Sequence, residues 1–185
     1  MKPDTLRVIQ WPVVEPVSLT DAKFQVGLMP EVTEFDRFLM DKVAATRRLI
    51  ETRLAMTMVA TKYRAVWKRA PSVLRIPAPP LLVADGYPIA ITADGVALAA
   101  ADFEVDTDAI PGEVTLAAGI GQKVTVEFWG GVPPEQTICP MLRSALLAYV
   151  DHAFHNRGIL ATDSAVELPQ AFETLLAASS WNGGW

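Results

Sequence analysis

The sequence predicts an α+β protein, in which a small body of antiparallel helices carries an inserted β-strand module and an extended C-terminal tail. Residues 18–55 and 134–157 place apolar side chains at helical spacing, whereas residues 57–129 alternate apolar and polar side chains between turn signals. The first strand follows the second helix directly, and the last strand leads into the long helix. We expect an N-terminal arm at 1–17, a helical body at 18–56 and 132–160, a β module at 57–131, and a tail with a short helix at 161–185.

Composition sets the class of protein before any motif is considered. Hydrophobic residues make up 51% of the 185 residues and charged residues 20%, so the chain can bury a core. No apolar run approaches the roughly 20 residues of a membrane span, and the N-terminus lacks the apolar core of a secretion signal. Cys139 is the lone cysteine, which excludes an internal disulfide. Its place before Pro140, in the first turns of an apolar helix, predicts a small packed side chain.

The predicted helices follow from their caps and their apolar stripes. Ser18 begins the first helix, which ends near Gly27 and Pro30, and residues 33–36 begin the second helix in the same way. Pro133 and Pro134 are expected to open the long helix, which the run 156–158 stops. A last short helix begins at Leu168 and Pro169. The apolar stripes are formed by Phe35, Phe38, Leu39, Val43, Leu49, Ile50 and Leu54, by Leu142, Ala145, Leu146, Tyr149, Val150, Ala153 and Phe154, and by Phe172, Leu175 and Leu176.

The predicted strands are short and separated by turn residues. Residues 57–67 alternate between two faces, and a short strand at 74–76 precedes a proline-rich connection at 77–80. Asp94-Gly95 is a hairpin turn signal, and Pro111-Gly112 marks another turn. The remaining strands are expected at residues 89–93, 96–98, 103–106, 113–116 and 123–129.

Charge is unevenly distributed along the chain. The segment Lys42–Arg75 contains nine basic residues and one acidic residue, a net charge of +8. The remainder contains seven basic and twenty acidic residues, a net charge of −13. A solvated basic face explains this distribution. An electrostatic contact surface for a protein partner explains it equally well. The alternative function is that of a DNA-binding protein that uses this segment.

No enzymatic motif interrupts this plan. Glycine-rich phosphate loops, nucleophile elbows and cysteine pairs are absent from the sequence. Asp151, His152 and His155 resemble a metal cluster, but His155 falls opposite the apolar stripe of its helix, which favours a solvated polar face. Asp102, Glu104, Asp106 and Asp108 alternate with other residues and predict an acidic face that is either solvated or turned toward another molecule or a channel. We therefore expect no catalytic residue, metal or cofactor.

Several segments, taken in order, resemble the phage head–tail connector (adaptor) proteins, in particular their longer, β-containing members. Residues 15–23 (EPVSLTDAK) resemble the opening of that family, and residues 46–51 (TRRLIE) resemble the end of its second helix. Residues 75–82 (RIPAPPLL), the pair 103–106 and 111–114, and the strand 124–131 are similar to its β module. Residues 152–158 (HAFHNRG) resemble the end of its closing helix. The loop 27–30 is shorter than usual, and the arm with Trp11 is longer.

The resemblance implies a structural virion protein of the neck between head and tail, made in the host cytoplasm. Such subunits form a dodecameric ring beneath the portal of a tailed phage or a phage-derived particle. Its partners would be the portal protein, further copies of itself, a downstream tail-side connector or stopper protein, and double-stranded DNA that passes through the channel without sequence-specific binding; no membrane is implied.

Three groups of residues are the candidates for these contacts. The subunit or portal interface is expected to use Arg47, Arg48, Arg64 and Arg69, together with tail residues Leu168, Phe172, Leu175, Leu176 and Trp181. The alternative for the tail is packing on the subunit's own body. The channel wall is expected to use Asp102, Glu104, Asp106 and Asp108.

Overall fold

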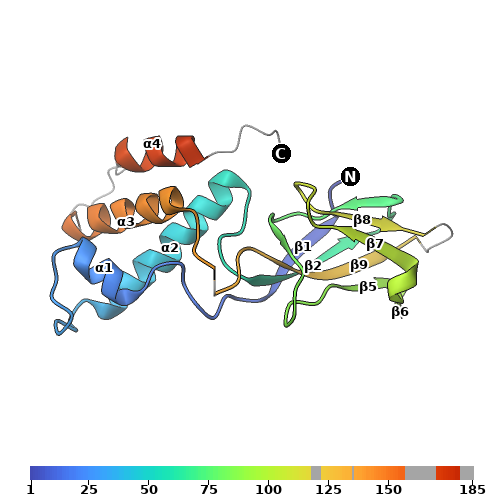
Figure 1. The fold of residues 1–185 in the computed structure, drawn as a ribbon, viewed down its shortest axis with the longest axis horizontal. Helices are drawn as coiled ribbons and strands as arrows, with labels where there is room; N and C mark the ends of the chain where they lie inside the picture. The colour runs from blue at the N-terminus through green and yellow to red at the C-terminus, as the bar shows by residue number, and fades with distance from the viewer. Residues whose placement is uncertain (118–121, 135, 157–169, 180–185) are drawn as a thin grey trace. The chain divides into compact units, whose positions relative to one another are not determined.

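A computed structural model describes residues 1–117, 122–134, 136–156 and 170–179, and it divides the chain into two compact units (Figure 1). The first, here called the β unit, comprises residues 1–14 and 55–136. The second, here called the helical unit, comprises the described residues of 15–54 and 137–184. Helices and antiparallel sheets together confirm the predicted α+β class.

The helical unit contains α1 (Leu19–Gln25), α2 (Asp36–Leu54), α3 (Pro140–His155) and α4 (Gln170–Ser179). Ser18 caps α1 as predicted, since its Oγ accepts a hydrogen bond from the Asp21 backbone N–H at 3.1 Å. Helix α3 packs against α1, α2 and α4. The two predicted stripes supply buried side chains in α2 and α3, among them Leu39, Val43, Ile50, Leu142, Leu146, Val150 and Phe154.

Helix α3 begins later than the sequence predicted. It starts at Pro140 rather than at Pro133 and Pro134, and Cys139 is its N-cap residue. A proline in the first helical turn costs nothing because its missing N–H would have no partner there, whereas a helix begun at residue 134 would hold Pro140 in its interior. Cys139 is therefore exposed at the cap, and the prediction of a packed small side chain there was wrong.

The β unit is built from two antiparallel sheets. The larger sheet runs in the order β1 (Thr5–Gln10), β2 (Thr61–Trp67), β9 (Val124–Gly130), β5 (Ala90–Ala93) and β6 (Val96–Ala97), and β4 (Leu81–Leu82) pairs with the end of β9. The smaller sheet runs in the order β3 (Val73–Arg75), β8 (Glu113–Leu116) and β7 (Phe103–Asp106). A short 3₁₀ helix, η1 (Ala100–Asp102), leads into β7.

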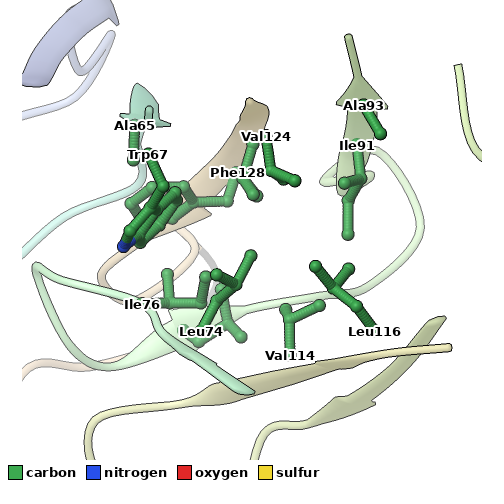
Figure 2. Close-up of a cluster of buried hydrophobic side chains, with 12 residues drawn as sticks. Ala65, Trp67, Leu74, Ile76, Ile91, Ala93, Val114, Leu116, Val124 and Phe128 are labelled. Carbon is green, nitrogen blue, oxygen red and sulfur yellow. The ribbon is translucent and has the colours of Figure 1, made fainter. Parts of the chain in front are cut away.

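Apolar side chains from both sheets meet in one core (Figure 2). Trp67 and Phe128 from the larger sheet and Leu74 and Val114 from the smaller sheet are fully buried there. The inner face of the larger sheet also contributes Ala65, Leu81, Ile91, Ala93, Val124 and Val126, and that of the smaller sheet contributes Leu116. Because side chains alternate along a strand, the residues between these point outward on opposite sides of the two-layer β unit.

Two details of the β unit refine the sequence prediction. Strand β1 lies within the segment expected as an extended arm, and it pairs with β2 from Thr5↔Val66 to Gln10↔Lys62. The predicted Asp94-Gly95 turn is confirmed, with φ angles of 49° and 88° between β5 and β6. Gly131 has φ 99°, and a Cβ there would lie 2.5 Å from the Val59 carbonyl oxygen, so only glycine fits this position.

Candidate interaction surfaces

Arg47, expected at a contact with a neighbour, lies inside the helical unit. Its side chain is 4% exposed, and its guanidinium donates to both carboxylate oxygens of Glu15, at 2.7 and 3.2 Å, and to Glu51 at 2.8 Å. Burial by itself lowers the pKa of Arg47, but the hydrogen bond to Glu15 and the charges of Glu51 and Glu15 outweigh it and raise the pKa. We do not retain Arg47 as a contact residue, because its charge is matched within the subunit.

The other three candidate arginines lie at the surface. Arg48 is exposed on α2, and Arg69 is exposed just after β2. Arg64 on β2 is 52% exposed, and its Nη2 lies 2.6 Å from Glu127 Oε1 on the adjacent strand. Lys62 Nζ lies 3.1 Å from the other oxygen of Glu127, so this carboxylate is shared by two cations. Hydrogen bonds from Arg64 and then from Lys62 lower the pKa of Glu127.

The basic segment Lys42–Arg75 is divided between the two units, and many of its charges have partners. Besides Arg47, Lys62 and Arg64, Arg53 pairs with Glu173 at 2.6 Å and Arg75 pairs with Glu113 at 3.1 Å. A DNA-binding surface would keep its cations available for phosphates. The pairing within the chain therefore gives no support to the DNA-binding alternative.

The four acidic residues do not form one equivalent row. Asp102 belongs to η1, and its Oδ2 accepts from the Ala99 backbone N–H at 2.8 Å. Asp106 Oδ1 accepts from the backbone N–H groups of Asp108 and Ala109, at 2.9 and 3.1 Å, so it caps the turn after β7. Glu104, Asp106 and Asp108 are exposed. Their place on a channel wall stays a prediction.

The tail helix packs on the subunit's own body. Phe172 is fully buried and Leu176 is 4% exposed in α4, and the Phe172 ring lies 5.3 Å from that of Tyr149 on α3. Leu175 is half-buried. Phe172 and Leu176 thus pack on the subunit's own body, which was the alternative to their contact with a neighbour or the portal. Leu168 and Trp181 lie outside the described residues.

No group of three or more histidine, cysteine, aspartate or glutamate side chains is placed to hold a metal ion in the described part of the chain. His155 Nδ1 lies 3.2 Å from Asp151 Oδ1, and His152 Nδ1 lies 3.2 Å from Asn156 Nδ2, so each histidine interacts within its own helix. Among residues 1–117, 122–134, 136–156 and 170–179, no helix is long and apolar enough to cross a membrane.

The strand register creates rows of charged residues that were not predicted from the sequence. Arg7 on β1 lies directly opposite Arg64 on β2, which lies opposite Glu127 on β9. In the smaller sheet Asp106 lies opposite Glu113, which lies opposite Arg75. The alternation of charged and apolar residues in each strand was a signal for outward-facing positions, but only the register shows that like charges are neighbours.

No protein-family model and no curated protein sequence matches this chain. Its fold is similar to chains in solved structures of gene transfer agent (GTA) particles. A chain of the virion of a native GTA particle and a chain of the neck of an empty GTA particle, computed with C6 symmetry, each match with a TM-score of 0.71 and 15% identity. Both matches cover 94% of this chain and 94% of the other.

A chain of the neck of a native GTA particle, computed with C12 symmetry, matches with a TM-score of 0.61 and 17% identity over 94% of this chain and 93% of that one. The likeness thus extends over both the helical unit and the β unit. At this level of identity it shows that the fold is shared.

Proposed function

We propose that this chain is a structural head–tail connector (adaptor) subunit in the neck of a tailed phage or of a phage-derived particle. The observation that carries the proposal is the fold likeness to chains of GTA particles, two of them from necks, over 94% of this chain. The ordered motifs of the adaptor family, found in the sequence alone, point to the same role independently. In this role the chain performs no catalysis and needs no cofactor.

The same proposal includes a ring of copies beneath the portal. The similar neck structures were computed with C6 and C12 symmetry, which supports a cyclic arrangement of subunits and agrees with a dodecamer. The ring would bind the portal protein on one side and a tail-side connector or stopper protein on the other. Its lumen would continue the channel for double-stranded DNA, which would pass without sequence-specific contacts.

The surface residues suited to these contacts are fewer than the sequence suggested. Arg48, Arg64 and Arg69 remain candidates because they are exposed, whereas Arg47 stabilises the helical unit. Leu168 and Trp181 remain candidates for binding the portal. Phe172 and Leu176 already pack within the subunit and would not be available to a partner unless α4 detached.

The test is to locate the chain in a particle. The chain, carrying a short tag, is expressed together with the other virion proteins encoded beside its gene, and purified particles are imaged after labelling with an antibody to the tag. The expected result is one cluster of label at the junction of head and tail. Averaged images of that junction should contain a ring of this fold. Label on the capsid shell or on the distal tail, or particles without the chain, would refute the proposal.

A further inference from the structure

The outer face of the larger sheet is basic. A row of directly opposed residues runs Arg7, Arg64, Glu127 across β1, β2 and β9, and Lys62 lies beside it on β2. This face therefore carries three cations and one carboxylate, and Glu127 binds two of the cations, Arg64 at 2.6 Å and Lys62 at 3.1 Å. Arg7 is exposed, and no ion pair joins it to another described residue of this chain.

The outer face of the smaller sheet is acidic, with a matching arrangement. The row Arg75, Glu113, Asp106 crosses β3, β8 and β7, and Glu104 lies beside it on β7. Here one cation faces three carboxylates, and Arg75 pairs with Glu113 at 3.1 Å. Glu104 and Asp106 are exposed. The two faces thus carry local net charges of +2 and −2.

These two faces point in opposite directions. The inner faces of both sheets meet in the core formed by Trp67, Phe128, Leu74 and Val114 (Figure 2). Residues adjacent in sequence to these core positions point away from the core on either side. The β unit is therefore a two-layer body with a basic outer side and an acidic outer side.

On each face of the isolated subunit, two residues of like charge lie directly opposite each other on neighbouring strands. Arg7 lies opposite Arg64, and Asp106 lies opposite Glu113. Like charges directly opposite each other on neighbouring strands are destabilising. A partner that brings carboxylates to the first face and cations to the second would relieve both pairs.

We propose that the partner is a second copy of this chain, whose acidic face docks on the basic face of the first. This inference rests on the proposed function, in which copies form a ring. The contact joins two different surfaces, so each copy uses one face for each neighbour, which is the geometry that a cyclic ring requires. It assigns Glu104 and Asp106 to contacts between subunits rather than to a channel wall.

The test is disulfide trapping between two full-length chains in which Cys139→Ser removes the exposed native thiol. One chain carries Thr5→Cys, on the outer face of β1 beside Arg7, and the other carries Thr115→Cys, on the outer face of β8 opposite Glu104. In both variants the cysteine is close in size to the threonine that it replaces, and no charged residue is changed. A mass tag on one chain distinguishes the mixed dimer from the two like dimers.

We expect the mixed dimer to form about tenfold faster than either like dimer at low salt, because complementary charge raises encounter rates by at least that factor. Near 1 M salt, where screening acts within about 3 Å, the advantage should disappear. Arg7→Glu in the Thr5→Cys chain should slow trapping, and Glu104→Arg in the Thr115→Cys chain should restore it. Thermal melts of each variant verify that the fold is kept.

Equal rates for mixed and like dimers would overturn the proposal. A control chain carries Val96→Cys, an exposed position on β6 outside both charged faces. Its rate of disulfide formation with the Thr5→Cys chain gives the background rate. Suppose that duplex DNA slows disulfide formation by the Thr5→Cys chain, while the mixed dimer forms no faster than the like dimers. That result would assign the basic face to DNA instead. These outcomes do not depend on where the chain lies in a particle, so a failure here leaves the proposed function standing.

Discussion

The helical unit contains buried ion pairs, whereas the β unit carries charged residues on the outer faces of its sheets. In the helical unit, Arg47 is buried between Glu15 and Glu51, and Lys23 is buried with its Nζ 2.6 Å from Asp36 and 2.9 Å from the Pro30 carbonyl oxygen. In the β unit, charged residues occupy the outer faces of both sheets. There they meet like charges as well as opposite ones.

This difference separates charges that stabilise the fold from charges available for contacts. A buried ion pair costs free energy if one partner is lost, because the other remains desolvated and unmatched. An exposed ion pair contributes about 0–1 kcal/mol, so its loss is tolerated. Substitutions at the buried ion pairs of the helical unit should therefore affect stability, whereas those on the β faces should affect association.

The largest effect is expected for Arg47→Met, which leaves Glu15 and Glu51 without their cation. We expect a loss of about 3–5 kcal/mol in the free energy of unfolding, measured by urea denaturation with far-UV circular dichroism. Replacing Glu15 and Glu51 by Gln in the same chain should recover much of this loss. The matched control is Arg37→Met, since Arg37 is 96% exposed and should change stability by under about 0.5 kcal/mol. A small loss at Arg47 would remove the distinction between the units.

A loss of about 3 kcal/mol or slightly more is expected for Phe172→Ala, because it empties the contact of α4 with Tyr149 on α3. Thermal melts and urea denaturation would measure it, and Thr174→Ala, on the exposed side of the same helix, is the control. The result decides the role of α4. An unchanged melting temperature would mean that the helix does not stabilise the subunit and is available to a partner.

Much of the fold was predictable because its signals are local. The strands β7 and β8 have the bounds that alternation and the Pro111-Gly112 turn predicted, and the Asp94-Gly95 hairpin is where its residues placed it. The start of α3 was predicted wrongly because two proline sites, 133–134 and 140, could each begin a helix. The helix begins at Pro140 because a proline inside a helix is destabilising. Strand β1 was missed because three prolines and Trp11 surround it in the first 17 residues.

The candidate contact residues were harder to predict because they depend on distant parts of the chain. From the sequence, Arg47 is expected to be an exposed cation on a helix. Its burial depends on Glu15, which lies 32 residues earlier in the chain and binds it. The Arg7–Arg64 pair exists only through the register of β1 on β2, which no local pattern specifies. The sequence shows where charge concentrates, but not which charges already have a partner within the chain.

A smaller effect, of opposite sign, is expected for Arg7→Thr. Removing one member of the Arg7–Arg64 pair should stabilise the chain by about 0.2–1 kcal/mol at low salt, since like charges no longer oppose each other. Urea denaturation at low and at high salt would measure the gain, which screening should abolish. Arg37→Thr serves as the control for general loss of a surface cation. Destabilisation by Arg7→Thr would show that Arg7 already has a favourable role in the isolated subunit.

The smallest effects concern acid titration, where each unit supplies one carboxylate. The Ser18 hydroxyl, which donates to Asp21 at 2.7 Å, and then Arg143 hold the pKa of Asp21 below its ordinary 3.8, while Arg64 and Lys62 hold that of Glu127 below 4.5. A depressed pKa in the folded state means that each group contributes stability above its ordinary pKa and loses it as the pH falls through the folded value. NMR titration of the carboxyl carbons should therefore give midpoints below those ordinary values. Ser18→Ala should raise only the Asp21 midpoint and Arg64→Ala only that of Glu127, because the two carboxylates are held by separate partners. If either substitution leaves its carboxylate's midpoint unchanged, the hydrogen bond named for it does not hold the charge in solution.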